Sequence, residues 1–595
     1  MKMRVADYIL QFIEQHGVND VFLLSGGGIM HLTDGLANNK NINVTCFHHE
    51  QAAAMAMDAY SRITGKFAVG YFTTGPGATN AITGCAGAWL DSVPCLFISG
   101  QAKRKESVYN LGIPGLRQVG VQEINIIPII QTITKYSVMV NQPEDIRYHL
   151  EQALYLAKSG RPGPVWLDIP IDVQGAIIET ESLKEFYPPR TFQHHQEALF
   201  TKLTFLLKES KRPVILAGQG VRLSGAIQSL VLFARSQDIP IVTTYLGIDV
   251  IDSTHPNYVG RVGIKGDRAG NFAVQNADVL IVIGSSLPVA ETGYDYENFA
   301  PKAKIVVVDI DQTAHEKNNV KINLMFEMDA YQFLKRMFKI YEEEQIGSSP
   351  NWLARCIAWR EKYPVNLPEY TDLEDTVNIY PFIDVLCQKL TDSDIVVTDA
   401  GSAFFAGAQA VKIKQGMRYI TSGGLATMGF GIPASIGASI AAKNQRVICI
   451  TGDGSFQQNI QELQTIVHYK LPIKIFVLNN EGYLSIRLTQ TKLFDGRLVG
   501  EGKESGVSFP DLENIAFAYG IPYYRVFNYP GLLILDHILQ LNGPAICEVI
   551  TPHYQEIIPA AASYRKEDGT MESKPLEDMY PFLPREEFEE DMKCD

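Results

Sequence analysis

The sequence predicts an α/β fold with three doubly wound parallel-sheet domains. Short apolar runs, such as 67–72 and 278–284, alternate with helical patterns over most of the 595 residues, which is typical of parallel sheets covered by helices. Hydrophobic residues make up 46% of the chain and charged residues 20%, so each domain can bury a core. At roughly 150 residues per domain, this length corresponds to about four domains or three large ones.

Three blocks and a tail divide the chain, and we assign them to residues 1–178, 195–341, 377–563 and 564–595. The strands that define the blocks are predicted at 67–72, 94–100, 163–170, 213–220, 239–245, 278–284, 303–311, 394–401, 446–451, 473–480 and 545–552. The segment 179–195, with Pro188, Pro189 and two histidines, predicts a linker, and the stretch 342–352 is polar and turn-rich. The first and third blocks resemble each other as α/β units punctuated by glycine.

Charge and composition exclude several classes of protein. The formal net charge is -14 and the pI is about 5.4, which argues against a general nucleic-acid-binding or anionic-membrane-binding surface. Two uncharged stretches, 67–90 and 419–442, are long enough to span a membrane, but several glycines and a proline interrupt each of them. We therefore predict no membrane helix.

The start of the chain and its cysteines indicate the compartment. Residues 1–18 lack the apolar core of a signal peptide and predict an amphipathic helix. The eight cysteines are scattered and form neither a CxxC pair nor a zinc-ligand spacing. We predict a soluble protein of a reducing compartment, the cytoplasm.

The most informative motif lies in the third block. A buried strand at 446–451 ends at Gly452-Asp453-Gly454-Ser455, a helix is predicted over 458–470, and the next strand ends at Asn480. Because the crossover of a βαβ unit is right-handed, Asp453 and Asn480 should lie at the carboxyl ends of strands in one parallel sheet. An Asp carboxylate, an Asn amide oxygen and the backbone carbonyl of Gly482 are suitable ligands for Mg²⁺, which shares its remaining positions with phosphate and water.

The glycines of this motif suit a phosphate group. Gly452 and Gly454 let the backbone approach phosphate oxygens closely, and the start of the following helix favours an anion. The alternative is a tight strand-to-helix turn followed by a polar strand end, because Gly-Asp-Gly turns are common. The motif alone leaves both interpretations open.

The motif resembles the metal-diphosphate motif of thiamine-diphosphate-dependent enzymes, in which GDG is followed 27 residues later by an asparagine pair. Three further segments, 48–66, 73–101 and 422–438, resemble the catalytic large subunits of the acetolactate-synthase-like family. The resemblance covers nearly the whole chain, in the family's order. It implies a pyrimidine-binding domain at 1–178, a central Rossmann-like domain at 195–341 and a domain at 377–563 that binds the diphosphate and the metal.

Glu50 is the expected catalytic acid. Thiamine catalysis requires loss of the proton from C2 of the cofactor, and a carboxyl group beside N1′ of the pyrimidine promotes this step. Glu50 follows the predicted strand 42–47 and begins a predicted helix. By spacing alone, it would more often compensate a helix dipole; the resemblance implies the catalytic role. His48 and His49 point in different directions and are not expected to bind a metal, although His49 is a candidate for lining the site.

The resemblance implies roles for further residues. Gln122 corresponds to a catalytic glutamine, although it could equally be a surface amide. Pro76 and Asn80 would touch the pyrimidine ring, Ala426 would offer its carbonyl to the 4′-amino group, and Met428 would hold the cofactor bent. The diphosphate would be held by Gly401, Ser402, Gly452, Gly454 and Ser455. In this family the pyrimidine domain of one subunit faces the diphosphate domain of another, which implies a homodimer or a tetramer with sites at the interface.

The sequence departs from acetolactate synthases in two places. Ser485, Ile486 and Thr489 stand where those enzymes carry a Met-Val pair and a Trp, so the acceptor pocket should be larger and more polar. Arg487 could anchor a carboxylate or phosphate, or be a surface-paired arginine. The central block lacks the arginines that hold the family's flavin. The sequence therefore leaves three possibilities open for the central pocket: FAD, another nucleotide, or no ligand.

The sequence leaves three functions open. The preferred one is decarboxylation of a 2-oxo acid, with pyruvate as the expected donor, and transfer of its two-carbon unit to a carbonyl acceptor such as a keto-sugar nucleotide. The alternative is a non-ligating decarboxylase or lyase, and the least favoured is a non-catalytic relative, since Glu50, Asp453 and Asn480 are all present. The tail is either a disordered acidic end or an active-site lid, and Tyr580 and Phe582 favour an ordered arm.

Overall fold

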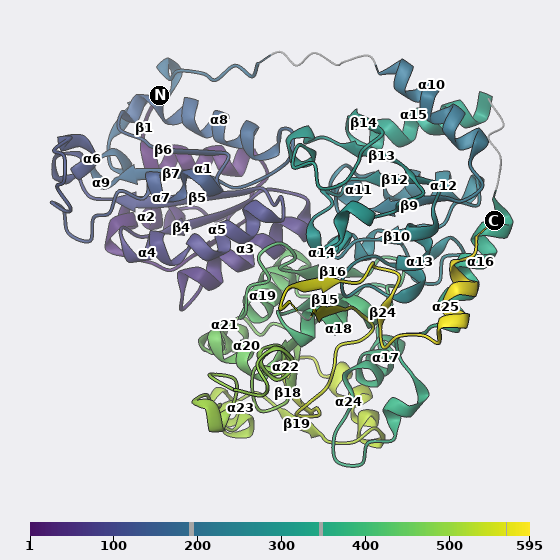
Figure 1. Ribbon diagram of the computed structural model, residues 1–595. Helices are drawn as coiled ribbons and strands as arrows, with labels where there is room; N and C mark the ends of the chain where they lie inside the picture. The colour runs from purple at the N-terminus through teal and green to yellow at the C-terminus, as the bar shows by residue number, and fades with distance from the viewer. Residues whose placement is uncertain (190–195, 344–348, 567, 595) are drawn as a thin grey trace.

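The computed structural model describes residues 1–189, 196–343, 349–566 and 568–594. Three six-stranded parallel sheets, each with helices packed against it, account for most of the chain (Figure 1). The first sheet has the order β3-β2-β4-β5-β7-β6. Its strands are β2 (Asp20–Leu23), β3 (Asn43–Cys46), β4 (Ala68–Phe72), β5 (Cys95–Gln101), β6 (Tyr136–Met139) and β7 (Val165–Pro170).

The central sheet has the order β11-β10-β9-β12-β13-β14, so its first strand is interior and the chain winds outward in both directions. Its strands are β9 (Pro213–Ala217), β10 (Ile241–Thr243), β11 (Tyr258–Arg261), β12 (Val279–Ile283), β13 (Lys304–Asp309) and β14 (Leu324–Glu327). Runs of Val and Ile in β12 and β13 are buried on both faces, as expected for a sheet that helices cover on both sides.

The third sheet repeats the topology of the first. Its order is β16-β15-β17-β18-β20-β19, which in both sheets reads second, first, third, fourth, sixth, fifth along the chain. The strands are β15 (Ile395–Thr398), β16 (Arg418–Thr421), β17 (Val447–Gly452), β18 (Ile473–Asn479), β19 (Tyr523–Val526) and β20 (Ala545–Ile550). The predicted fold class, with three doubly wound parallel sheets, is confirmed.

Helices α3 (Glu50–Thr64) and α19 (Gly431–Ala441) join the first and third sheets. The two helices pack so closely that a Cβ on Gly437 would lie 2.0 Å from the carbonyl oxygen of Ala56. One continuous apolar core contains Phe72 and Phe97 of the first domain together with Ile432 and Cys449 of the third. The positions of the first and third sheets are therefore coupled through α3 and α19.

Some predicted elements differ from those observed. The helix predicted over 458–470 is interrupted: α20 (Asp453–Gln458) begins at the aspartate of the motif, and η10 (Ile460–Glu462) and α21 (Leu463–His468) follow. The predicted N-terminal helix, α1 (Val5–Gln15), is preceded by a short strand, β1 (Lys2–Arg4). That strand pairs with β8 (Ile177–Glu179), at the start of the predicted linker. Parts of the two predicted connecting segments, 190–195 and 344–348, lie outside the described residues.

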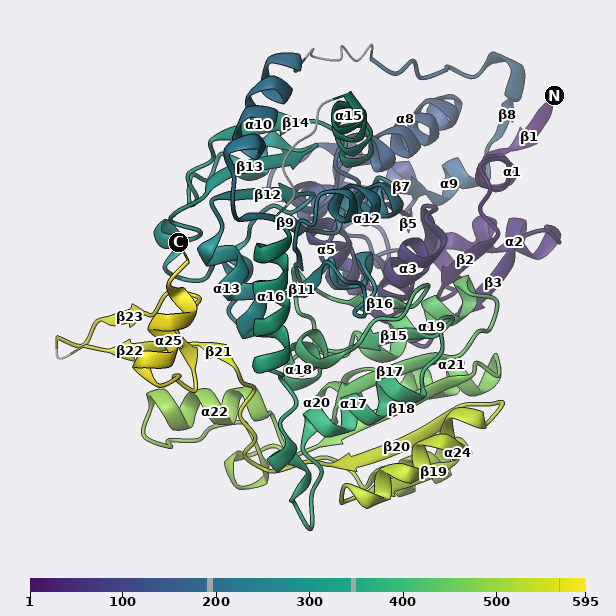
Figure 2. The ribbon, with the colours of Figure 1, turned by 90° about the vertical axis from the view of Figure 1, so that its right-hand side faces the viewer.

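The tail forms short strands and a helix, and the helix lies against the central domain (Figure 2). Strands β21 (Ala560–Ala561) and β24 (Met579–Tyr580) pair, as do β22 (Ser563–Arg565) and β23 (Met571–Ser573). The last helix, α25 (Arg585–Met592), packs near α13 (Arg268–Asn276) and α16 (Pro350–Lys362).

Hydrogen bonds hold this tail against the rest of the chain. Trp359 donates its indole N–H to Asp591, and Arg268 donates to the carbonyl of Met579. Within the part of the chain that the structure describes, no helix is both long and apolar enough to cross a membrane.

Candidate active site

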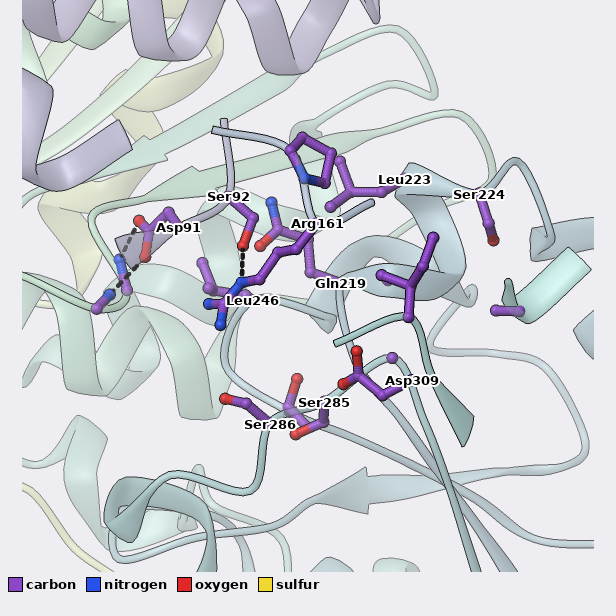
Figure 3. Close-up of a pocket in the computed structure, with 18 of the residues that line it drawn as sticks. Asp91, Ser92, Arg161, Gln219, Leu223, Ser224, Leu246, Ser285, Ser286 and Asp309 are labelled. Atoms are coloured by element: carbon purple, nitrogen blue, oxygen red, sulfur yellow. Dashed lines mark hydrogen bonds between the residues drawn. The ribbon is translucent and has the colours of Figure 1, made fainter. Parts of the chain in front are cut away.

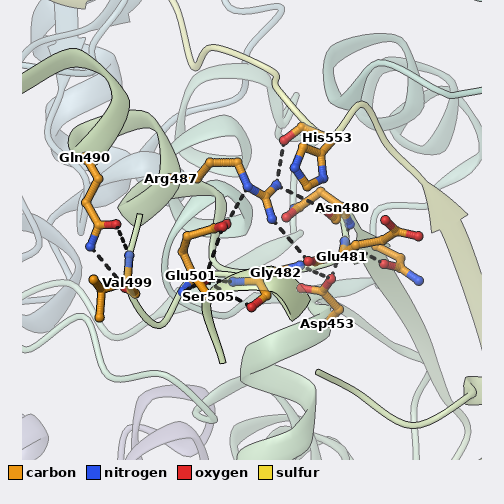
Figure 4. A network of polar contacts seen from close by, with 12 residues as sticks. Asp453, Asn480, Glu481, Gly482, Arg487, Gln490, Val499, Glu501, Ser505 and His553 are labelled. Atoms are coloured by element: carbon orange, nitrogen blue, oxygen red, sulfur yellow. Dashed lines mark hydrogen bonds and ion pairs between the residues drawn. The ribbon is translucent and has the colours of Figure 1, made fainter. Parts of the chain in front are cut away.

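The GDG turn and the asparagine pair lie side by side at the carboxyl ends of neighbouring strands. In the register of β17 and β18, Gly452 stands opposite Leu478, so Asp453 and Asn480 follow directly at the same sheet edge (Figure 4). The Asp453 carboxylate is buried and accepts the backbone N–H groups of Gly454 at 2.8 Å and Gly482 at 3.0 Å. Burial raises the pKa of Asp453 to about 6, and these N–H donors oppose that rise.

The oxygen atoms of this cluster are compatible with a divalent cation. Asn480 is buried, and its Oδ1 atom has no hydrogen-bond partner. A buried unsatisfied oxygen costs free energy, which a bound cation would relieve. Groups of three or more His, Cys, Asp or Glu side chains that could hold a metal are absent from the described residues. Mg²⁺ therefore fits a carboxylate, an amide oxygen and a carbonyl here better than a soft metal does.

The two glycines of the turn differ in the space that surrounds them. A Cβ on Gly454 would lie 2.2 Å from the Tyr483 ring, whereas Gly452 has open space around it. Ser455 is buried in the first turn of α20. The backbone of this turn is thus accessible from the side of Gly452.

A second turn, after β15, lies near the first. Gly401 has a left-handed φ of 65° just before α18 (Ser402–Ala410), and Ser402 is buried. A Cβ on Gly401 would lie 3.6 Å from Oγ of Ser485, so helix α22 (Leu484–Leu493) faces this turn. Ile486 and Thr489 are exposed on the same helix.

Asp399, which the sequence analysis missed, organises this region. Its buried carboxylate accepts the backbone N–H groups of Gly429 at 3.0 Å and Gly431 at 2.8 Å, and the hydroxyl of Thr451 at 3.2 Å. Asp399 thereby links the ends of β15 and β17 to the start of α19. The available signal was its position in TDAG, directly after a buried strand.

Ala426 and Met428 lie on a loop that the first domain fixes. Ala426 is exposed with a left-handed φ of 51°, and the sulfur of Met428 lies 3.7 Å from the amide nitrogen of Gln458. The Asp91 carboxylate of the first domain accepts the N–H groups of Gly423 and Gly424 at 2.9 Å and 2.6 Å. This fixed loop leaves Ala426 at the surface of the chain.

Glu50, Pro76, Asn80 and Gln122 gather at one edge of the first sheet. Glu50 is the first residue of α3 and is buried, and Asn80 donates to its carboxylate at 3.0 Å. Pro76 begins α4 (Pro76–Asn80), after Gly75 with φ 68°. A Cβ on Gly75 would lie 2.0 Å from the carbonyl oxygen of Gln122, whose side chain is exposed.

The side chain of His49 caps the start of α3. Its Nδ1 atom accepts the backbone N–H of Gln51 at 3.0 Å, which is the bond of an N-cap side chain. The backbone N–H of His48 is directed to Glu462 at 3.1 Å. In this chain the two histidines therefore shape the entry to the helix that carries Glu50.

No hydrogen bond joins the cluster around Glu50 to the cluster around Asp453 among the residues that the structure describes. Residues beside the two clusters do make contact, since the side chains of Gln51 and Asn459 lie 3.5 Å apart. The two-subunit site that the sequence predicts stays a prediction.

The structure contradicts both sequence predictions for Arg487. It is neither a surface-paired arginine nor a free anchor for substrate, because its side chain is fully buried and forms an ion pair with Glu501 at 2.6 Å. The sequence could not reveal this, since the segments that cover the side chain lie elsewhere in the chain.

A cavity of about 520 Å³ lies between the central domain and the other two (Figure 3). It is lined by Gln219 and Gly220 at the end of β9 and by Asp309 at the end of β13. Its charged lining residues are four acids and two bases, namely Asp91, Glu291, Asp309, Asp329, Lys158 and Arg161. Arg161 already donates to Ser92 at 2.7 Å and pairs with Asp311 at 3.3 Å.

The fold and these strand-end clusters define a class of protein, and comparison with known families agrees. Three family models match: the N-terminal TPP binding domain of thiamine pyrophosphate enzymes over residues 3–129, their central domain over 200–337, and their C-terminal TPP binding domain over 399–549. The chain belongs to this family. Thiamine pyrophosphate is thiamine diphosphate, so the predicted cofactor is confirmed.

Within the family the chain is similar to acetolactate synthases. It is 34% identical to the acetolactate synthase large subunit of Cyanidium caldarium, over 93% of this chain and 94% of that protein. It is 35% identical to a probable acetolactate synthase large subunit of Methanocaldococcus jannaschii, over 92% of each chain, and 32% identical to acetolactate synthase isozyme 2 large subunit of Escherichia coli K12, over 94% and 97%. The predicted branch and enzyme class, a thiamine-diphosphate-dependent carboligase, are confirmed.

Proposed function

We propose that this chain decarboxylates a 2-oxo acid, with pyruvate as the donor, and transfers the two-carbon unit to a carbonyl acceptor. The observation that carries the proposal is the cluster of Asp453, Asn480 and Gly482, in which a buried Asn480 oxygen has no partner and a carboxylate lies beside it. The similarity to proteins named acetolactate synthase supports the choice of donor and reaction.

The third domain would hold the charged end of the cofactor. Asp453, Asn480 and the carbonyl of Gly482 would bind Mg²⁺, which neutralises the diphosphate. The diphosphate itself would lie against the two strand-end turns, whose members are Gly401, Ser402, Gly452, Gly454 and Ser455. Support comes from the proximity of both turns to α22 and from the close packing around Gly454.

Bound thiamine diphosphate supplies a carbon nucleophile that also accepts the electron pair left when CO2 departs. Glu50 would hold a proton at N1′ of the pyrimidine, and Asn80 orients the Glu50 carboxylate through its 3.0 Å hydrogen bond. Pro76 and Met428 would contact the rings, and the Ala426 carbonyl would accept a hydrogen bond from the 4′-amino group. Gln122, exposed beside Gly75, would face the substrates.

A second copy of the chain would complete the site. We propose a homodimer or tetramer in which the pyrimidine domain, 1–178, meets the diphosphate domain, 377–563, of another subunit, while 195–341 forms the central domain. The exposure of Gln122 and Ala426 supports this arrangement, because residues that touch a shared ligand should lie at the surface of a single chain. We also propose that the enzyme is cytoplasmic. For the tail, residues 564–595, we propose a role as a lid over the active site.

The acceptor side of the site would be open and polar. Ser485 lies near the Gly401 turn, and Thr489 and Ile486 are exposed on α22, where no tryptophan narrows the space. We therefore propose that a large carbonyl compound, such as a keto-sugar nucleotide, be tested as acceptor beside a second pyruvate.

Flavin is not part of the proposed function. The central cavity has twice as many acidic as basic lining residues, and both Arg161 and Asp309 are engaged by protein partners. A dinucleotide's diphosphate is better matched by free arginine groups. The cavity residues do not provide them, so we propose that FAD is not a required cofactor.

CO2 release from pyruvate by the purified protein with thiamine diphosphate and Mg²⁺ tests the proposal. We expect release together with acetolactate or another ligated product, identified by mass spectrometry. Release with acetaldehyde alone would favour the non-ligating decarboxylase. If cofactor binds but no CO2 forms, pyruvate is not the donor, and larger 2-oxo acids become the substrates to test.

A further inference from the structure

Arg487 is a fully buried arginine that the proposed chemistry does not use. It lies on α22, and its ion pair with Glu501 is enclosed on both sides, with side-chain exposures of 0% and 5%. Arginine is almost never fully buried unless it is paired, because the removal of a charge from water is strongly unfavourable. Such a pair is weak evidence for stability, so its geometry is the better guide to its role.

The guanidinium group holds three backbone carbonyls. Nη1 donates to the carbonyl oxygens of Asn480 at 3.0 Å and His553 at 2.7 Å, and Nη2 donates to that of Glu481 at 3.1 Å (Figure 4). Asn480 and Glu481 directly follow β18 and form the loop that carries the proposed cation ligands. Glu481 has a left-handed φ of 58°, which is unfavourable for a residue with a side chain, so the loop needs outside support.

The opposite side of the same loop is held by Asp453 and by the backbone after Val499. Asp453 accepts the N–H groups of Asn480 at 3.3 Å and Gly482 at 3.0 Å. Tyr483 donates its N–H to the carbonyl of Glu501 at 2.7 Å. The loop 480–483 is therefore fixed from its N–H side by Asp453 and from its carbonyl side by Arg487.

We propose that Arg487 and Glu501 are positioning residues that hold loop 480–482 in its cation-binding form before the cofactor arrives. Glu501 fixes the guanidinium, and the guanidinium fixes the carbonyls of Asn480 and Glu481. Asn480 Oδ1 is thereby kept buried, unpartnered and ready to bind. Preorganisation of this kind lowers the ordering cost of binding. This inference rests on the proposed function of the loop.

Binding of Mn²⁺ together with thiamine diphosphate, followed by electron paramagnetic resonance of free Mn²⁺, tests the inference without turnover. We expect Arg487→Met to raise the half-saturating Mn²⁺ concentration by about 10–100-fold, as is usual when a group that orients ligands is removed. Arg487→Lys should give an intermediate shift, because an ammonium lacks the planar fork that reaches several carbonyls. Saturating metal and cofactor should restore kcat to within a few-fold.

Three controls separate the possible outcomes. Arg497→Met removes an exposed arginine of the same region, whose ion pair with Asp495 has side-chain exposures of 70% and 87%, and should leave binding unchanged. Glu501→Gln keeps the side-chain volume and should weaken Mn²⁺ binding even if Arg487→Met fails to fold. A folded Arg487→Met or Glu501→Gln protein with wild-type affinity would overturn the positioning role. If Asp453→Asn also leaves Mn²⁺ binding unchanged, the proposed cation site itself is wrong.

Discussion

At the scale of single residues, Glu50 provides the sharpest test of the chemistry. We expect Glu50→Gln to retain thiamine diphosphate binding, because an amide oxygen can still accept the hydrogen bond from Asn80. Turnover should fall by about 10²–10⁴-fold, the usual contribution of a positioned acid or base. Fluorescence titration checks that the cofactor still binds, and CO2 release measures turnover. Undiminished turnover would contradict the role of Glu50.

Asp168 predicts how stability depends on pH. Burial raises the pKa of Asp168 to about 7, although Ser99 donates to it at 2.6 Å and Gln101 at 2.9 Å. The folded state therefore holds the proton more tightly than the unfolded state, so this contribution to stability is complete below about pH 4 and is lost as pH rises towards 7. Asp168→Asn does not titrate. The Tm of Asp168→Asn relative to wild type should therefore rise between pH 5 and 7. Over this range the free energy of unfolding of wild type falls by up to about 1.4 kcal/mol per pH unit. A constant Tm difference would contradict this assignment.

The sequence revealed local residue roles but not those that depend on distant covering segments. Asp453 and Asn480 could be predicted because the crossover of one βαβ unit brings them together. The burial of Arg487 could not, since its partners Glu501 and His553 lie 14 and 66 residues away. Asp399 was missed for the same reason.

At the scale of elements, buried strands were predictable and helix interruptions were not. Strand β12, for example, is a continuous apolar run bounded by polar residues, and this pattern can be recognised without knowledge of the rest of the fold. The helix predicted over 458–470 is broken at Asn459, whose side chain donates to the carbonyl of Gly429 at 2.7 Å. A tertiary contact with a distant loop therefore decided the local structure.

The crossing of α3 and α19 gives a prediction at this scale. We expect Gly437→Ala to destabilise the protein by about 1–3 kcal/mol, because the added Cβ would collide with the Ala56 carbonyl 2.0 Å away and overpacked cores relax only partly. Gly87→Ala, in α5 (Ile82–Leu90), is the matched control, since no atom lies within 4 Å of its added Cβ. That control should be neutral or raise stability by up to about 1 kcal/mol. Equal Tm values for the two variants would contradict the close packing.

At the scale of the whole molecule, hydrogen bonds and ion pairs connect the three domains. Asp91 of the first domain binds Gly423 and Gly424 of the third, and Arg161 of the first pairs with Asp311 of the central domain at 3.3 Å. Family resemblance predicted the three domains. It did not predict these contacts, because they depend on how the domains pack together, and the hydrophobic pattern within each domain carries no information on that packing.

Among these contacts, we expect the loss of the Asp249 carboxylate to lower stability most. This central-domain carboxylate is 3% exposed and pairs at 2.8 Å with Arg222 of its own domain and at 2.8 Å with Arg418 of the third. Asp249→Asn leaves two partly buried guanidinium groups without their shared countercharge, which typically costs about 3–5 kcal/mol. Calorimetry should show a lower Tm and a separation of the transitions of the central and third domains. Glu179→Gln, which removes an exposed 3.6 Å pair with Lys2, should change stability by less than about 1 kcal/mol. If Asp249→Asn behaves like that surface variant, the ion pairs of Asp249 do not hold the central and third domains together.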